Sequence, residues 1–172
     1  MEVFERESIV LHEKGAKRVS PLFIPTMISN MAAGNLAIRY GLKGDCLNIV
    51  TACSTGTHCV GEAYRLIRFG LADAALAGGT EEGITNMSLA GFGNLGAITK
   101  SDDPMKAGLP FDARRSGFVA GEGAGALVLE SLEHAQARGA NIIAEITGFG
   151  STGDAYHMTA PEPSGEGAVR AM

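Results

Sequence analysis

The sequence lacks several features that would place it in particular classes. It has no tryptophan, only 6% aromatic residues, and no apolar run near the ~20 residues that span a bilayer. The net charge of −5 argues against general binding of nucleic acid, which needs a basic surface. The first residues, MEVFERES, carry both signs of charge and no apolar core. We therefore expect no signal peptide, no membrane segment and no nucleic-acid partner.

Cysteine is scarce, and its spacing is not that of a disulfide framework. The three cysteines are Cys46, Cys53 and Cys59, an odd number without a CxxC pair. This usage favours a reduced compartment, and we expect a cytoplasmic protein. Cys53, His58 and Cys59 do not match a common zinc spacing, so we expect no metal site.

Glycine, in contrast, is abundant, with 24 residues, and apolar runs alternate with helical periods. This alternation predicts an α/β fold. Strands are expected within 46–52, 72–79, 117–131 and 141–150, and residues 1–19 and 20–27 are expected to be loop or extended. Helices are expected from Met27 to Gly41, from Gly56 to Gly70, at the start of 84–98, over 131–138, and at the C-terminal end, after a surface loop near 101–110.

Cys53 stands between the apolar run of 46–52 and an amphipathic helix with small residues around it. A helix N-terminus favours the thiolate of a cysteine, and small neighbours permit a sharp, accessible turn. This is the strand–turn–helix arrangement of nucleophile sites, so Cys53 is a candidate for covalent acyl transfer. The alternative is that Cys53 is a buried, inert side chain, as we expect for Cys46 and Cys59.

Other motifs carry less information about function. Two GxGxxG matches, at 91–96 and 148–153, lack the strand-to-helix context of a dinucleotide site. His58 is expected to point away from the thiol, and His157 lies in a loop where functional residues are common. Glu81 and Glu82 suit acid–base work, although a cap or surface role is the commoner one for such a pair.

Four stretches together resemble one family of enzymes. TACSTGTHCVGEAYRLI (51–67) resembles the active-site segment of β-ketoacyl-acyl-carrier-protein synthases, the condensing enzymes of fatty-acid synthesis. KRVSPLFIPTMISNMAAG (17–34), PFDARRSGFVAGEGAGALVLESLEHAQARGA (110–140) and ITGFGSTGDAYHMTAPEP (146–163) resemble further segments in the family's order. Within the family, the chain is most similar to the bacterial elongation branch, synthase II.

The resemblance implies a thiolase-like fold of stacked α-β-α-β-α layers, incomplete in this chain, and usually a homodimer. It implies that Cys53 accepts an acyl chain and that its own N–H helps to form the oxyanion hole. No cofactor is implied, because substrates arrive on the phosphopantetheine of an acyl carrier protein. The other implied roles are acyl-pocket lining (Phe92), contact with the phosphopantetheine arm (Thr159), carrier docking (Lys17, Arg18), and the dimer interface near the partner's acyl tunnel (Phe23, Met27).

The sequence also departs from the family pattern. Ser116 stands where an aspartate is usual, and Gly96 where the elongation enzyme has an arginine that aids carrier docking. The family's HGT histidine and KxxxGH pair match none of the four histidines. We expect residues 1–172 to be an internal fragment, with the later part of the N-terminal half up to about 145 and the start of the C-terminal half. Such a fragment is not expected to condense alone.

Three other functions remain open from the sequence. A polyketide-type ketosynthase shares the same motifs. A cysteine hydrolase needs a base histidine beside Cys53, which no pattern here supplies. A non-catalytic chain-length-factor subunit usually lacks the cysteine.

Overall fold

A computed structural model describes all residues, 1–172. The chain forms two units, each from two separate stretches of sequence: Met1–Asn48 with Thr80–Ala124, and Ile49–Gly79 with Gly125–Met172. We call them unit 1 and unit 2. These units alternate along the chain, and the expected boundary near residue 145 stays a prediction.

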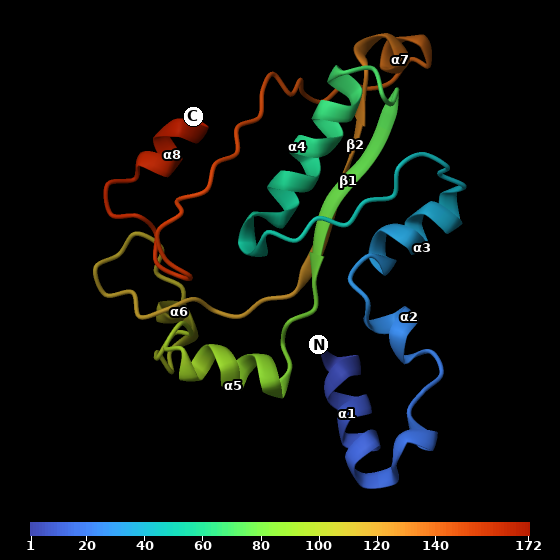
Figure 1. Cartoon of the computed structure of the whole chain (residues 1–172). Coiled ribbons are helices and arrows are strands. Elements are labelled where there is room, and N and C mark those ends of the chain that lie inside the picture. The colour runs from blue at the N-terminus through green and yellow to red at the C-terminus, as the bar shows by residue number, and fades with distance from the viewer. The chain divides into compact units, whose positions relative to one another are not determined.

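Unit 1 is mainly helical (Figure 1). Its helices are α1 (Glu2–Lys14), α2 (Phe23–Met27), α3 (Met31–Tyr40), α5 (Asn86–Asn94), α6 (Pro104–Ala107) and the 3-10 turn η1 (Ala16–Arg18). Glu5 fixes the start of α5, since its carboxylate accepts the Met87 N–H at 2.6 Å. The Thr85 hydroxyl and this N–H hold the pKa of Glu5 below its ordinary value.

Unit 2 holds most of the two-stranded sheet. It contains η2 (Ala52–Ser54), α4 (Thr55–Arg68), β1 (Ala74–Glu81), β2 (Gly123–Glu130), α7 (Leu132–Ala137) and α8 (Glu166–Ala171), with the last residues of β1 and the first of β2 assigned to unit 1. The strands are antiparallel, because Ser131 bonds Asp73 at one end while Gly78 lies against Gly125 and Ala126. Gly78 has no room for a Cβ beside the Gly125 carbonyl.

Several expected elements are confirmed. The helix after Cys53 is α4, the strand expected within 72–79 is β1, and the one within 117–131 is β2. The helix expected from Met27 is α3, ended by Gly41 with φ of 65°, and Gly139, at φ of 66°, follows α7. Helices at the start of 84–98 and at the C-terminal end are also present. The loop near 101–110 contains the short helix α6.

Two expectations about the first 27 residues are wrong. Residues 1–19, expected as strand or loop, contain α1, whose acidic first turn and basic last turn suit the helix dipole. Residues 20–27, expected as extended, contain α2. Pro25 is tolerated there because it lies in the first turn, where the backbone N–H would have no helical partner.

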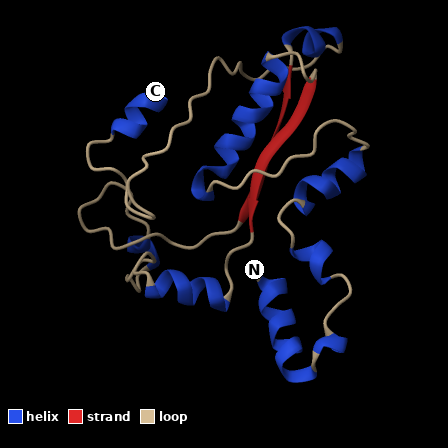
Figure 2. Ribbon diagram, viewed as in Figure 1, coloured by secondary structure: helices blue, strands red, loops and turns tan.

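Two expected strands are absent. Residues 46–52 and 141–150 form no ladder in the structure, and Figure 2 shows 141–150 as loop. A strand exists only when a neighbouring strand pairs with it, and neither segment has such a neighbour in this chain. Each segment has the apolar composition of a strand, but composition does not show whether a second strand is present to pair with it.

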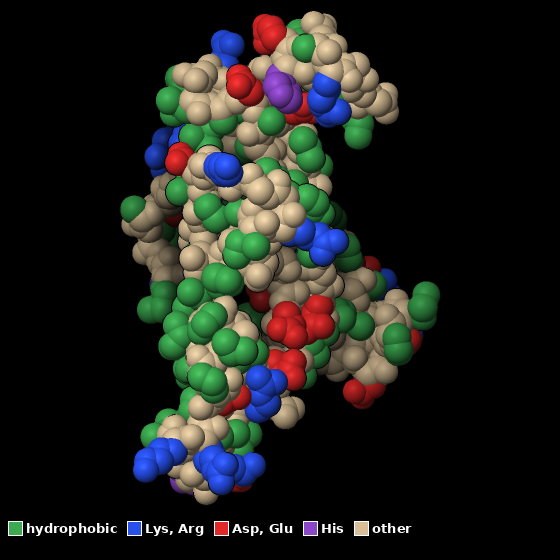
Figure 3. Space-filling model, turned by 90° about the vertical axis from the view of Figure 1, so that its right-hand side faces the viewer, with side chains coloured by type: hydrophobic (Ala, Val, Ile, Leu, Met, Phe, Trp, Pro, Cys, Tyr) green, Lys and Arg blue, Asp and Glu red, His purple; other side chains and the backbone are tan.

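Little hydrophobic core is present in either unit. The buried apolar side chains are Ala63, Ala77 and Ala135, all in unit 2. Many large apolar side chains are exposed instead, and hydrophobic groups cover much of the face in Figure 3. None of the helices has the length and apolar composition that crossing a membrane requires.

Candidate functional site

Cys53 lies at the middle of η2, immediately before α4, and is exposed. The preceding residue, Ala52, has φ of 50°, the left-handed region that residues with a Cβ avoid. The turn thus brings a thiol to the start of a helix, as the sequence predicts. The Cys53 N–H donates no hydrogen bond within the chain and is free to receive an anion.

Hydrogen bonds from both sides hold this turn. The Thr51 N–H donates to the Thr55 hydroxyl at 2.9 Å, and that hydroxyl donates to the Ala52 carbonyl at 2.8 Å. The Ser54 N–H donates to the Thr51 carbonyl at 3.1 Å. Thr51 and Thr55 therefore bracket Ala52 and Cys53 and stabilise the strained turn.

His58, on the first turns of α4, makes no hydrogen bond to Cys53. Its Nδ1 lies 2.5 Å from the Thr51 hydroxyl and its Nε2 2.7 Å from the Ser151 hydroxyl. Both ring nitrogens are therefore occupied by hydroxyl groups. The geometry gives no support to a cysteine hydrolase, which needs a histidine bonded to its thiol.

A groove of about 430 Å³ lies along α4, beginning at Gly56. Phe149 packs on Gly61 so closely that a Cβ on this glycine would meet three carbons of the ring. The Arg65 guanidinium lies 5.2 Å from the centre of the same ring. Cys53 does not line the groove, whose lining residues are Gly56, Thr57, Val60, Gly61, Ile146, Gly148 and Phe149.

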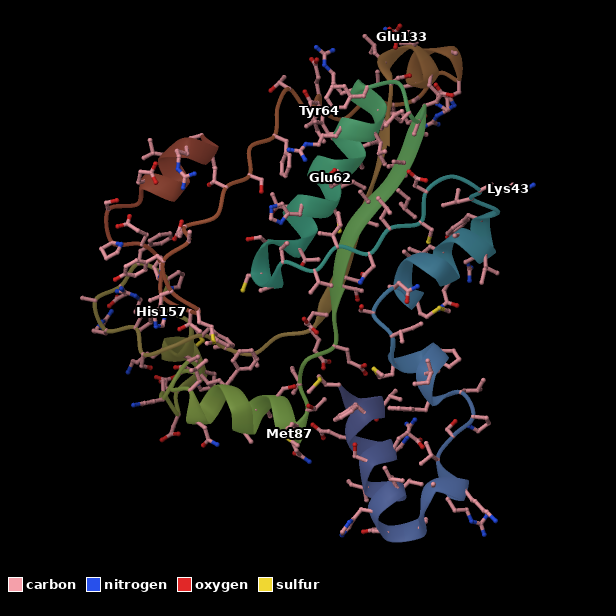
Figure 4. All side chains as sticks on the ribbon, viewed as in Figure 1. Lys43, Glu62, Tyr64, Met87, Glu133 and His157 are labelled. Carbon is pink, nitrogen blue, oxygen red and sulfur yellow. The ribbon has the colours of Figure 1, made fainter.

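The loop that carries Thr159 is organised by local hydrogen bonds. His157 Nδ1 accepts the N–H groups of Thr159 and Ala160, both at 3.1 Å. Asp154 accepts the Glu162 N–H at 3.0 Å. The Thr159 hydroxyl has no partner in the chain and stays available for a ligand. His157, marked in Figure 4, thus shapes the loop through its ring nitrogen.

Unit 1 carries the remaining predicted site residues. Phe92, on α5, meets Phe118 edge to face with ring centres 5.2 Å apart. Lys17 and Arg18, in η1, are exposed and form no ion pair. Phe23 contacts Phe4 with ring centres 6.5 Å apart, and Met27 is 40% exposed. Cys53 and Thr159 belong to unit 2.

Some features of the site are not evident from the sequence. The bond from His58 to Ser151 and the packing of Phe149 on Gly61 depend on contacts between residues far apart in the sequence. The positive φ of Ala52 is set by local hydrogen bonds of Thr51 and Thr55, but no residue type in this stretch indicates it. The sequence gives one indication of the Phe149 contact. Phe149 lies between Gly148 and Gly150, which have no side chains to keep its ring away from a helix.

The described geometry, a cysteine on a strained turn before a helix in a mixed helix-and-sheet chain, is that of an enzyme with a nucleophilic cysteine. The family model described as "Beta-ketoacyl synthase, N-terminal domain" matches residues 2–135. The chain belongs to the β-ketoacyl synthase family, and the predicted resemblance is confirmed.

Named relatives agree with this assignment. The 3-oxoacyl-[acyl-carrier-protein] synthase 2 of Staphylococcus aureus is 55% identical over all 172 residues, which are 43% of its own length. A β-ketoacyl synthase crystal structure from Burkholderia phymatum is 37% identical, with a TM-score of 0.89, over 99% of this chain and 42% of that one. The chain therefore spans less than half the length of these relatives.

A further solved structure shows a type II polyketide synthase acyl carrier protein in complex with its ketosynthase bound to a hexaketide. It is 34% identical, with a TM-score of 0.90, over 96% of this chain and 43% of that one. The thiolase-like fold is thus confirmed.

Proposed function

We propose that this chain is part of a fatty-acyl elongating synthase in which Cys53 accepts an acyl group from an acyl carrier protein. The observation that carries the proposal is the exposed Cys53 on a strained turn before α4, with its own N–H unpaired. Family membership and 55% identity to a synthase 2 support the reaction class.

The proposed chemistry proceeds in two steps. The Cys53 thiolate attacks the carbonyl of the acyl thioester, and the free Cys53 N–H stabilises the oxyanion. The carbon–sulfur bond to phosphopantetheine then breaks, and its thiolate leaves with the electron pair. Malonyl-carrier protein then loses CO₂, and the resulting enolate attacks the acyl-Cys53 carbonyl. The new carbon–carbon bond forms as the Cys53 thiolate leaves with its electron pair.

The second step needs groups that support decarboxylation. The family resemblance assigns them to the HGT and KxxxGH histidines and lysine, which none of the four histidines here matches. We infer that these 172 residues do not condense by themselves, and that the reaction belongs to a longer protein.

The acyl carrier protein is the proposed partner, and no cofactor takes part. Lys17 and Arg18 suit docking of an acidic carrier, because both are exposed and neither has an acidic neighbour within ion-pair distance. Thr159 suits contact with the phosphopantetheine arm, since its hydroxyl has no partner. Phe92 is proposed to line the acyl pocket.

We also propose a homodimer in the cytoplasm. The α2 residues Phe23 and Met27 are candidates for its interface, and neither is buried in this chain. A reactive, exposed thiol such as Cys53 suits a reducing compartment. No nucleic-acid or membrane partner is proposed.

Polyketide synthesis is the second candidate. The likeness to a polyketide ketosynthase is high in fold, with a TM-score of 0.90, but its identity of 34% is well below the 55% to the synthase 2. Fatty-acid elongation is therefore the function that the sequence favours.

The test is acyl loading, followed by intact-protein mass spectrometry after incubation with acyl-carrier protein. Cys53→Ser is expected to abolish the adduct, whereas the matched variants Cys46→Ser and Cys59→Ser keep it. Adducts at the wild-type level in Cys53→Ser would show that another residue carries the acyl group. Steady formation of ketoacyl product by the chain would overturn the inference that it does not condense.

A further inference from the structure

A short segment, residues 147–151, docks along one face of α4. The Tyr64 hydroxyl donates to the Thr147 carbonyl at 3.4 Å, and His58 Nε2 meets the Ser151 hydroxyl at 2.7 Å. Between them, the Phe149 ring packs on Gly61. The contacting helix positions, 58, 61 and 64, are three residues apart and so lie on one face of α4. They meet residues 151, 149 and 147 in that order, so the docked segment runs antiparallel to α4, the helix on which Figure 4 labels Tyr64 and Glu62.

His58 joins this docked segment to the turn that carries Cys53. Its other nitrogen, Nδ1, lies 2.5 Å from the hydroxyl of Thr51. One ring nitrogen of a neutral imidazole donates and the other accepts, and a hydroxyl can do either. Both tautomers of His58 therefore satisfy both bonds, and the link does not depend on which one is present.

Thr51 is the residue through which this link reaches the nucleophile. It precedes Ala52, whose φ of 50° persists only where the surrounding structure holds it. The Thr51 N–H and carbonyl are bonded to Thr55 and Ser54, and its hydroxyl is bonded to His58. All three polar groups of Thr51 are thus engaged, and His58 is the one partner that lies beyond the turn itself.

We propose that His58 is a positioning residue for Cys53. Its Nδ1 holds the Thr51 hydroxyl, and this bond keeps the thiol at the start of α4. The rate at which Cys53 reacts with an electrophile therefore depends on this link. The inference rests on the proposed role of Cys53 as nucleophile.

The experiment measures alkylation of Cys53 by iodoacetamide in the full chain, with peptide mass spectrometry and Cys46 as the internal reference. His58→Asn and His58→Gln form a matched pair, because the amide nitrogen of Asn replaces Nδ1 and that of Gln replaces Nε2. Each variant therefore keeps one of the two hydrogen bonds and loses the other.

His58→Gln, which loses the Thr51 bond, is expected to slow alkylation of Cys53 about threefold to tenfold relative to Cys46, the effect of one ordinary hydrogen bond. His58→Asn keeps that bond and is expected to retain the wild-type rate. Thr51→Val should slow the reaction as His58→Gln does, and Thr51→Ser, which keeps the hydroxyl, should restore it.

Equal slowing in both His58 variants would overturn the proposal, because it would show a general structural role. Unchanged rates in His58→Gln and Thr51→Val, or slowing in His58→Asn alone, would overturn it too. Acyl loading of the wild type is measured separately. A chain that is alkylated at Cys53 but never acylated would refute the proposed function without deciding the role of His58.

Discussion

Replacing Gly61 with alanine tests whether the docked segment 147–151 packs on α4 as described. In an open helix interior, Gly→Ala stabilises by about 1 kcal/mol. At Gly61 the new Cβ meets three carbons of the Phe149 ring, so the ring must move. Overpacking of this kind costs about 1–3 kcal/mol, and contact with ring carbons on this scale belongs at the upper end. We expect a net loss of about 1–2 kcal/mol.

Gly91→Ala is the matched control, because Gly91 lies within α5 and a Cβ there meets nothing within 4 Å. It should gain about 0.5–1 kcal/mol from helix propensity alone. Urea unfolding followed by circular dichroism compares the two, since the chain has no tryptophan to report by fluorescence. Hydrogen exchange at 147–151 should also accelerate in Gly61→Ala. A stabilised Gly61→Ala with unchanged exchange at these residues would refute the packing argument.

Two further predictions concern charge. The Glu130 carboxylate accepts hydrogen bonds from Arg138, which has the larger effect, and from His134, and these bonds lower its pKa from 4.5 to about 2. The ionised form of Glu130 therefore stabilises the fold above pH 4.5, and this stabilisation is lost as the pH falls toward 2. Urea unfolding at several pH values measures the difference in unfolding free energy between wild type and Glu130→Gln, and this difference should vanish as the pH falls from 4.5 to 2. A difference that stays constant would contradict the role given to the ionised Glu130. Glu133→Gln is the control, because Glu133 forms no ion pair. Joint reversal of Lys17 and Arg18 to glutamate should weaken binding of acyl carrier protein about fivefold to thirtyfold at low salt, as for two surface pairs, and less at high salt. Equal binding in titration calorimetry, or equal loss in Lys43→Glu, would argue against docking there.

The parts of the fold that sequence predicts are those with local causes. The helix after Cys53, the glycine ends at Gly41 and Gly139, and the sheet strands follow from periodicity and turn chemistry in short windows. The position of Cys53 before α4 follows in the same way, and it is the part of the site that needed no distant contact.

The secondary-structure predictions that are wrong have two physical causes. The apolar runs at 46–52 and 141–150 have strand character, but a strand needs a partner, and local pattern does not reveal whether one is present. At the N-terminus, the mixed charges of residues 1–19 give no clear helical period, although they place acidic residues in the first turn of α1 and basic residues in its last. Residues 20–27 are expected to be extended because of their prolines, but Pro25 lies in the first turn of α2, where proline is tolerated.

The most direct test of the central claim is the identity of the acylated residue. The chain is incubated with acyl-carrier protein, digested, and mapped by mass spectrometry before and after hydroxylamine treatment, which cleaves thioesters. The account predicts one adduct, on the peptide that contains Cys53, and its removal by hydroxylamine. An adduct on any other residue, or one that resists hydroxylamine, would contradict it.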